Sequence, residues 1–153
     1  MKTLKEGDPI PEIKLPSDLG REVSLSEFKG KKVVLYFYPK DDTPGCTKQA
    51  CEFRDLQGNF DKVKTVVLGV SRDSLESHQA FRKKYNLNFP LLSDENKKVH
   101  ELFGAWGEKV MYGKTTVGVL RTTVVIDEKG IVQSIKQGVK AEGNAERTLE
   151  MVS

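Results

Sequence analysis

Two continuous apolar runs, residues 32–38 and 64–71, dominate the hydrophobic pattern of the chain. Their length and their β-branched and aromatic residues predict two buried strands. Between them, residues 44–60 carry apolar groups four, three, three and four positions apart, which fits one face of a helix. A strand, a helix and a second strand in this order predict a parallel pair of strands joined by a crossover helix.

Shorter apolar segments predict two hairpins. Residues 10–15 and 23–25 indicate a small hairpin before the first core strand. Later in the chain, residues 120–127 and 131–135 predict an antiparallel pair around a turn at 128–130. The second pair extends the predicted sheet.

Further helices are indicated by local signals. Asp73 with Glu76 three positions later matches a capping box, which predicts a helix over residues 74–84 that ends near Asn86. The other predicted elements are a short strand over 89–92, a helix over 94–103 closed by Gly104, and a last helix over about 141–152.

Together these elements predict an α/β fold with a mixed central sheet flanked by helices. At 153 residues the chain is long enough to bury a core without disulfides or a structural metal, and we expect residues 1–153 to form a single domain. The loop after the first core strand lies at the carboxyl end of that strand. Open α/β sheets usually bind ligands there, so this loop is the expected place of a site.

The charge composition argues against two classes of partner. The 25 basic and 22 acidic residues are mixed along the chain, so the net charge of +3 indicates neither nucleic-acid nor membrane binding. No segment approaches the roughly 20 apolar residues of a membrane span, and the first residues lack the apolar stretch of a secretion signal. We therefore expect a soluble, cytoplasmic protein.

Cys46 and Cys51 are the only cysteines, and both fall on the helix predicted after the first core strand. In a reducing cytosol such a close pair is more often catalytic or metal-binding than structural. Thr43 and Pro44 fit the N-cap and first position of that helix, which puts Cys46 in its first turn. Backbone N–H groups and the helix dipole favour the thiolate there, and the thiolate is the form that attacks.

Other features oppose ionisation of this first thiol. Burial on the apolar helix face disfavours a charged sulfur, and the carboxylates of Asp41 and Asp42 lie close in sequence. A cation near the sulfur is therefore needed. Lys40, Lys48 and the distant Arg121 are all candidates, and spacing does not distinguish them.

The thiol of Cys51 is expected to lie on a different side of the predicted helix from that of Cys46. Five residues of helix place Cys51 about 140° around the axis from Cys46 and about 7.5 Å along it. Cys51 then shares its side with Arg54, Asp55 and Gly58, nearer to solvent. An intact helix holds the two Cα atoms beyond the roughly 7 Å limit for a disulfide, so a bridge requires local unwinding.

The residues around both thiols resemble a known family. Pro39, Thr43 and Cys46, in the pattern Pro-x-x-x-Thr-x-x-Cys, match the active-site motif of peroxiredoxins. The extension Cys-x-x-x-x-Cys-x-Phe-Arg-Asp over residues 46–55 resembles the peroxiredoxin Q branch, also called bacterioferritin-comigratory protein. The resemblance covers nearly the whole chain, with further matching segments at residues 37–38, 70–74, 106–109 and 121–127.

This resemblance implies a thioredoxin-like fold and thiol-dependent reduction of hydrogen peroxide and organic hydroperoxides. It implies that Cys46 is the peroxidatic and Cys51 the resolving cysteine, which form an internal disulfide during turnover. Thr43 and Arg121 would orient the peroxide and stabilise the thiolate, and Pro39 would shield the pocket. Thioredoxin or a similar thiol reductant would restore the dithiol without a metal, haem or flavin cofactor. The branch is often monomeric, so we expect a monomer.

Two alternatives to a peroxidase remain open. A protein thiol-disulfide oxidoreductase is disfavoured because such enzymes space their cysteines two residues apart. A noncatalytic redox sensor or binding module would be oxidised once, without turnover. Insulin reduction would indicate the oxidoreductase, stoichiometric oxidation the sensor, and peroxide consumption coupled to thioredoxin the peroxidase.

Four other residues lie outside the predicted thiol site. His78 and His100 are isolated on predicted helices, where surface or packing roles are expected. Because both are remote in sequence from the cysteines, a four-ligand zinc site is not expected. Trp106 and Tyr112 are candidates for lining an opening where a reductase docks, with a packing role as the alternative.

Overall fold

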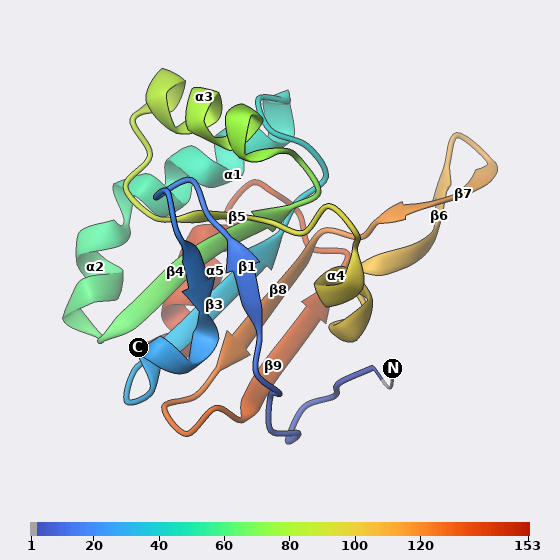
Figure 1. Cartoon of the computed structure of the whole chain (residues 1–153). Coiled ribbons are helices and arrows are strands. Elements are labelled where there is room, and N and C mark those ends of the chain that lie inside the picture. Colours follow the sequence, from blue (N-terminus) through green and yellow to red (C-terminus); the bar gives the residue numbers. More distant parts are fainter. Residues whose placement is uncertain (1–2) are drawn as a thin grey trace.

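The computed structural model describes residues 3–153, and its centre is a five-stranded mixed sheet (Figure 1). In spatial order the strands are β5 (Leu91–Ser93), β4 (Thr65–Ser71), β3 (Lys32–Phe37), β8 (Thr122–Ile126) and β9 (Val132–Gln137). β3, β4 and β5 run parallel, whereas β8 is antiparallel to both β3 and β9. The predicted mixed sheet, its parallel core pair and the second hairpin are confirmed.

Alternate residues of β3 serve two cores, one on each face of the sheet. Val34 and Tyr36 pack under the larger helices, whereas Val33, Leu35 and Phe37 pack on the opposite face. The first face is covered by α1 (Pro44–Asp55), α2 (Gln57–Lys62), α3 (Leu75–Tyr85) and α5 (Asn144–Val152). The second is covered by the hairpin of β1 (Lys14–Pro16) and β2 (Glu22–Ser24), the 3₁₀ helix η1 (Leu25–Phe28) and α4 (Lys98–Leu102).

Two predicted helix ranges and one predicted helix cap differ from the structure. The helix predicted over 44–60 breaks at Leu56, whose φ of −98° and ψ of 5° end α1, and the next turn contains the poor helix formers Gly58 and Asn59. The predicted capping box was wrong, because α3 is capped by the Ser74 hydroxyl. The helix predicted over 94–103 is only the short α4, which starts after a left-handed residue, Lys97.

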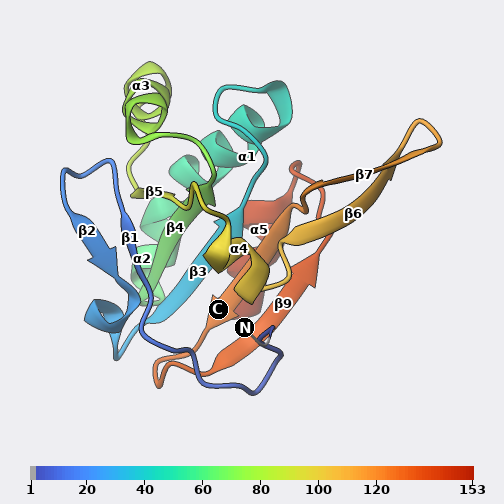
Figure 2. The same cartoon turned by 45° about the vertical axis from the view of Figure 1, so that its right-hand side comes forward.

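A two-stranded ribbon, which the sequence analysis did not predict, projects from the body of the protein (Figures 1 and 2). It consists of β6 (Trp106–Met111) and β7 (Lys114–Val119), paired antiparallel. Its two-residue turn, Tyr112 and Gly113, has positive φ at both positions, as a type I′ hairpin turn requires. Val110, Tyr112 and Val117 are exposed there, so Tyr112 has no packing role.

The helices of this fold are short, and α1 contains 12 residues. Within residues 3–153, none has the length together with the apolar character needed to cross a membrane.

Candidate active site

Cys46 lies in the first turn of α1, just beyond the carboxyl end of β3, and is 1% exposed. Thr43 is the N-cap residue and Pro44 opens the helix, as predicted. The first backbone bond of the helix runs from Thr47 N–H to Thr43 O. The preceding N–H groups of Gly45 and Cys46 therefore have no acceptor within the helix and can receive an oxygen atom that carries negative charge.

Arg121 is the cation that lies against this sulfur. Its Nη2 is 3.4 Å from Cys46 Sγ. Lys48, another candidate, instead pairs with Glu142 at 3.6 Å. The backbone on both sides of Arg121 is fixed, because Leu120 N–H donates to Ala105 and Val139 N–H donates to the Arg121 carbonyl. The fold thus joins the residue before β8 to the start of α1, which spacing in the sequence could not establish.

Gln49 is a site residue that the sequence analysis missed. Its side chain is fully buried, and its Oε1 accepts a hydrogen bond from Arg121 Nη1. A signal was present, because Gln49 follows Cys46 by three positions and therefore lies on the same buried side of the helix. A buried amide on that side requires a polar partner.

Thr43 and Pro39 lie in the loop between β3 and α1. The Thr43 hydroxyl does not cap the helix, and it donates instead to the Lys40 carbonyl at 2.8 Å. Its proton is therefore used, while its oxygen retains lone pairs that can accept a hydrogen bond. Pro39 is exposed at the end of β3.

The two carboxylates of this loop are paired with cations. Asp41 is buried, and its Oδ2 lies 2.7 Å from His78 Nδ1. Asp42 Oδ2 accepts from Lys84 Nζ at 2.8 Å, and this bond lowers the pKa of Asp42. The charges expected to oppose a Cys46 thiolate are thus compensated locally.

His78 is charged in this arrangement. Its Nε2 lies 2.9 Å from the Leu92 carbonyl, while Nδ1 faces the Asp41 carboxylate, so both ring nitrogens carry protons. Burial acts to lower the pKa of His78, but the hydrogen bond and charge of Asp41 outweigh it and raise the pKa. His78 and His100 are both fully buried, so the surface role is wrong for each. His100 Nδ1 lies 2.7 Å from Asp94 Oδ2.

The Asp41 cluster is a poor metal site. Asp41, Asp73 and His78 offer ligand atoms within 4.8 Å of one another. Both nitrogens of His78 are engaged in hydrogen bonds, and Asp73 accepts from the Asp41 N–H and the Ser71 hydroxyl. A metal would have to break these bonds, so the cluster is better described as an anchor of the loop.

Raising the pH is expected to destabilise the protein through His78. Because its pKa is raised above 6.5 in the folded state, the ion pair contributes fully to the free energy of unfolding below about pH 6.5. That contribution is lost as the pH rises through the raised pKa. Urea unfolding at mildly acidic and alkaline pH measures the loss. His78→Gln should be less stable at the acidic pH and less dependent on pH, and an equal dependence in both proteins would contradict this assignment.

Cys51 lies further along the same intact helix. It is half-buried, whereas Cys46 is buried, and both are free thiols. This difference agrees with the predicted rotation between them. Because α1 is continuous from Pro44 to Asp55, a bond between the two sulfurs requires unwinding of the helix.

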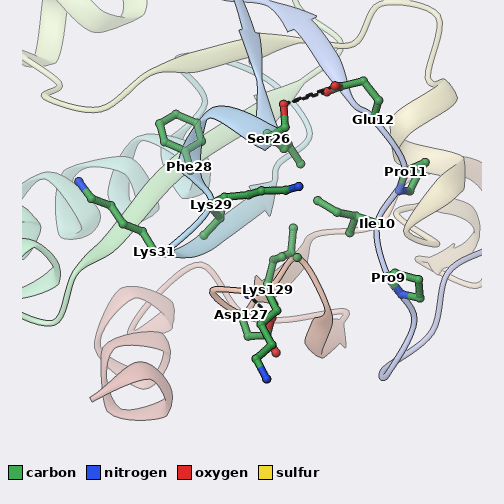
Figure 3. Close-up of a pocket in the computed structure, with 14 residues that line it drawn as sticks. Pro9, Ile10, Pro11, Glu12, Ser26, Phe28, Lys29, Lys31, Asp127 and Lys129 are labelled. Atoms are coloured by element: carbon green, nitrogen blue, oxygen red, sulfur yellow. Dashed lines mark hydrogen bonds between the residues drawn. The ribbon is translucent and has the colours of Figure 1, made fainter.

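A separate cavity of about 230 Å³ lies at the amino end of β3, opposite the end that leads to Cys46 (Figure 3). Its walls include Ile10, Phe28 and Lys29, together with Val33 at the start of β3. Because Cys46 follows the other end of β3, this cavity does not belong to the thiol site.

Comparison with known proteins identifies the family. The AhpC/TSA family model matches residues 6–135. A Coxiella burnetii protein provisionally named peroxiredoxin Bcp is 49% identical over 93% of this chain and 94% of its own length.

Two solved structures are similar throughout. A peroxiredoxin Q mutant from Xylella fastidiosa has a TM-score of 0.92 and 33% identity, covering 99% of this chain and 97% of that one. The bacterioferritin comigratory protein of Xanthomonas campestris has a TM-score of 0.86 and 38% identity, covering 92% and 89%. The chain therefore belongs to the AhpC/TSA family, in its Bcp or peroxiredoxin Q branch, and is a thiol-dependent peroxidase with a thioredoxin-like fold.

Proposed function

We propose that Cys46 is the peroxidatic nucleophile and that Cys51 resolves its oxidised form. Arg121 and Thr43 hold the peroxide, and Pro39 shields the pocket from solvent. The observation that carries this proposal is the Arg121 guanidinium 3.4 Å from a buried sulfur at a helix start. A permanent cation and free backbone donors at one sulfur favour a thiolate and a leaving group with negative charge.

In the first step, the Cys46 thiolate attacks one oxygen of a hydroperoxide. The S–O bond forms as the O–O bond breaks, and the leaving oxygen takes a proton to become water or an alcohol. Sulfur loses two electrons and the peroxide gains them, which leaves a sulfenic acid. Arg121 and the N–H groups at the helix start stabilise the departing charge, while the Thr43 oxygen accepts the peroxide O–H.

In the second step, the Cys51 sulfur attacks the Cys46 sulfur. The S–S bond forms as the S–O bond of the sulfenic acid breaks, and the sulfenic hydroxyl leaves with the proton of the Cys51 thiol as water. Two electrons from thioredoxin or a similar thiol reductant then restore the dithiol, in keeping with a cytoplasmic location. Because both thiols belong to one chain, a monomer suffices.

The proposed substrates are hydrogen peroxide and organic hydroperoxides. The Xanthomonas campestris relative has been described for its alkyl peroxide reduction activity. NADPH consumption with thioredoxin, thioredoxin reductase and each peroxide tests the proposal. Repeated turnover supports it, whereas a single stoichiometric oxidation or activity on insulin alone would overturn it.

Cys51→Ser is expected to separate the two steps. Its Cys46 should react with one equivalent of peroxide at the normal rate, but steady-state turnover with thioredoxin should fall by about tenfold or more, since the sulfenic acid lacks its internal partner. Stopped-flow oxidation and NADPH-coupled turnover on the same preparation measure both. Full steady-state activity would show that resolution occurs through another thiol.

A further inference from the structure

Buried hydrogen bonds connect Arg121 to the first residue of α5. Arg121 Nη1 donates to Gln49 Oε1, and Gln49 Nε2 donates to Asn144 Oδ1 at 2.8 Å. The Thr123 hydroxyl donates to the same Asn144 oxygen at 3.0 Å. Gln49, Asn144 and Thr123 are 0, 3 and 3% exposed, so water competes little for these bonds.

The Arg121 guanidinium fixes the donor and the acceptor of every hydrogen bond in this network. Arginine has donors and no acceptor, so Gln49 must present its oxygen to Arg121 and its NH₂ to Asn144. Asn144 must then accept with its oxygen, and the Thr123 hydroxyl must donate to it. If the Asn144 amide were reversed, its NH₂ would face the NH₂ of Gln49. If the Gln49 amide were reversed as well, its NH₂ would face the Arg121 guanidinium.

We propose that Asn144 is a positioning residue of the thiol site, which orients the Gln49 amide and thereby holds the Arg121 guanidinium against the Cys46 sulfur. The proposal rests on the function proposed above for Cys46. Asn144 does not touch the sulfur, and its effect reaches the thiolate only through Gln49 and Arg121.

The turn before α5 is attached to α1 on both sides of Gln49. The Gly143 N–H donates to Glu52 Oε1 at 2.8 Å, and Lys48 pairs with Glu142 at 3.6 Å. Gln49 lies between the two cysteines, so unwinding of α1 for disulfide formation must separate it from Asn144. Asn144 therefore favours the intact helix, in which Arg121 is in place for the peroxide.

This arrangement predicts that only the first of the two chemical steps is slowed when Asn144 is replaced. Asn144→Ala should slow oxidation of Cys46 by about tenfold and lower the fraction of Cys46 that is thiolate at neutral pH. Formation of the disulfide should be as fast as in the unmodified protein, or faster.

Matched variants separate positioning from stability. Thr123→Val removes the hydroxyl that donates to Asn144 Oδ1, with little change in shape. It should slow the oxidation of Cys46 and reduce its thiolate fraction as Asn144→Ala does. Thr148→Val is the control, because Thr148 is equally buried on α5 but its hydroxyl bonds only to the local Asn144 carbonyl. Asn144→Asp keeps an acceptor facing Gln49 and should recover part of the oxidation rate.

The oxidation rate and the thiolate absorbance against pH are measured in a Cys51→Ser background, so that only Cys46 responds. Disulfide formation is followed with Cys51 present. Slow oxidation in Asn144→Ala and Thr123→Val, but not in Thr148→Val, supports the proposal. Normal oxidation and titration in the first two variants, or an equal loss in Thr148→Val, overturns it. Peroxide consumption by folded Cys46→Ser would instead refute the function proposed for Cys46.

Discussion

Cys46→Ser is expected to abolish peroxide reduction, with a fall of roughly a thousandfold or more in the rate. A serine hydroxyl remains protonated at neutral pH, so Arg121 and the helix start have no sulfur anion to stabilise. The substitution leaves the Arg121, Gln49 and Thr43 side chains in place. Peroxide consumption under the NADPH-coupled conditions measures the effect directly.

The matched control for this variant is Cys51→Ser, the same substitution five residues further along α1. Cys51→Ser should still consume one equivalent of peroxide, whereas Cys46→Ser should consume none. Thermal unfolding of both proteins excludes loss of the fold as the cause. Substantial turnover by folded Cys46→Ser would remove this residue from the role of nucleophile.

The sequence predicted those elements whose apolar pattern is strong and continuous. β3, β4 and the start of α1 are bounded by clear signals; the two strands are buried on both faces, as their continuous apolar runs predicted, and α1 is buried on one face. The β6–β7 ribbon escaped prediction because it packs little of its surface and therefore shows no buried period. Its one local signal was Tyr112-Gly113, a weak pair for a type I′ turn.

The sequence predicted those parts of the site whose residues are close together in the chain. Thr43, Pro44 and Cys46 share one helix start, so their arrangement followed from capping rules. For the cation, the sequence left three candidates. Arg121 is brought to the sulfur by the packing of strands and helices, which its distance along the sequence from Cys46 does not reveal. Asn144 was unpredictable for the same reason: it approaches Gln49 only when α5 packs beside α1.

Polar contacts join both ends of α1 to α3. At its start, the Asp41 carboxylate accepts from the Ser77 hydroxyl and contacts His78. At its end, Arg54 Nη1 donates to the Tyr85 carbonyl at 2.7 Å. These contacts do not depend on the helical turns between the two cysteines, and so can outlast their unwinding.

Oxidation of Cys46 and Cys51 to a disulfide is therefore expected to unwind α1 from Thr43 to about Phe53 while both flanks stay anchored. An intact helix keeps the two Cα atoms too far apart for a bridge, so the protection of the intervening amides must be lost when the bridge forms. Hydrogen exchange of the reduced and oxidised proteins measures this loss. Amides in the segment should exchange at least about tenfold faster after oxidation, with β3 and β4 unchanged.

The variant Cys51→Ser treated with one equivalent of peroxide provides the control for this experiment. It carries the oxidised sulfur but cannot form the bridge, so its α1 amides should remain as protected as in the reduced protein. Faster exchange in that control would mean that oxidation itself, and not the disulfide, unwinds the helix. Unchanged exchange in the disulfide form would show that the two thiols meet without unwinding. That result would contradict the helical separation of Cys46 and Cys51 from which the prediction follows.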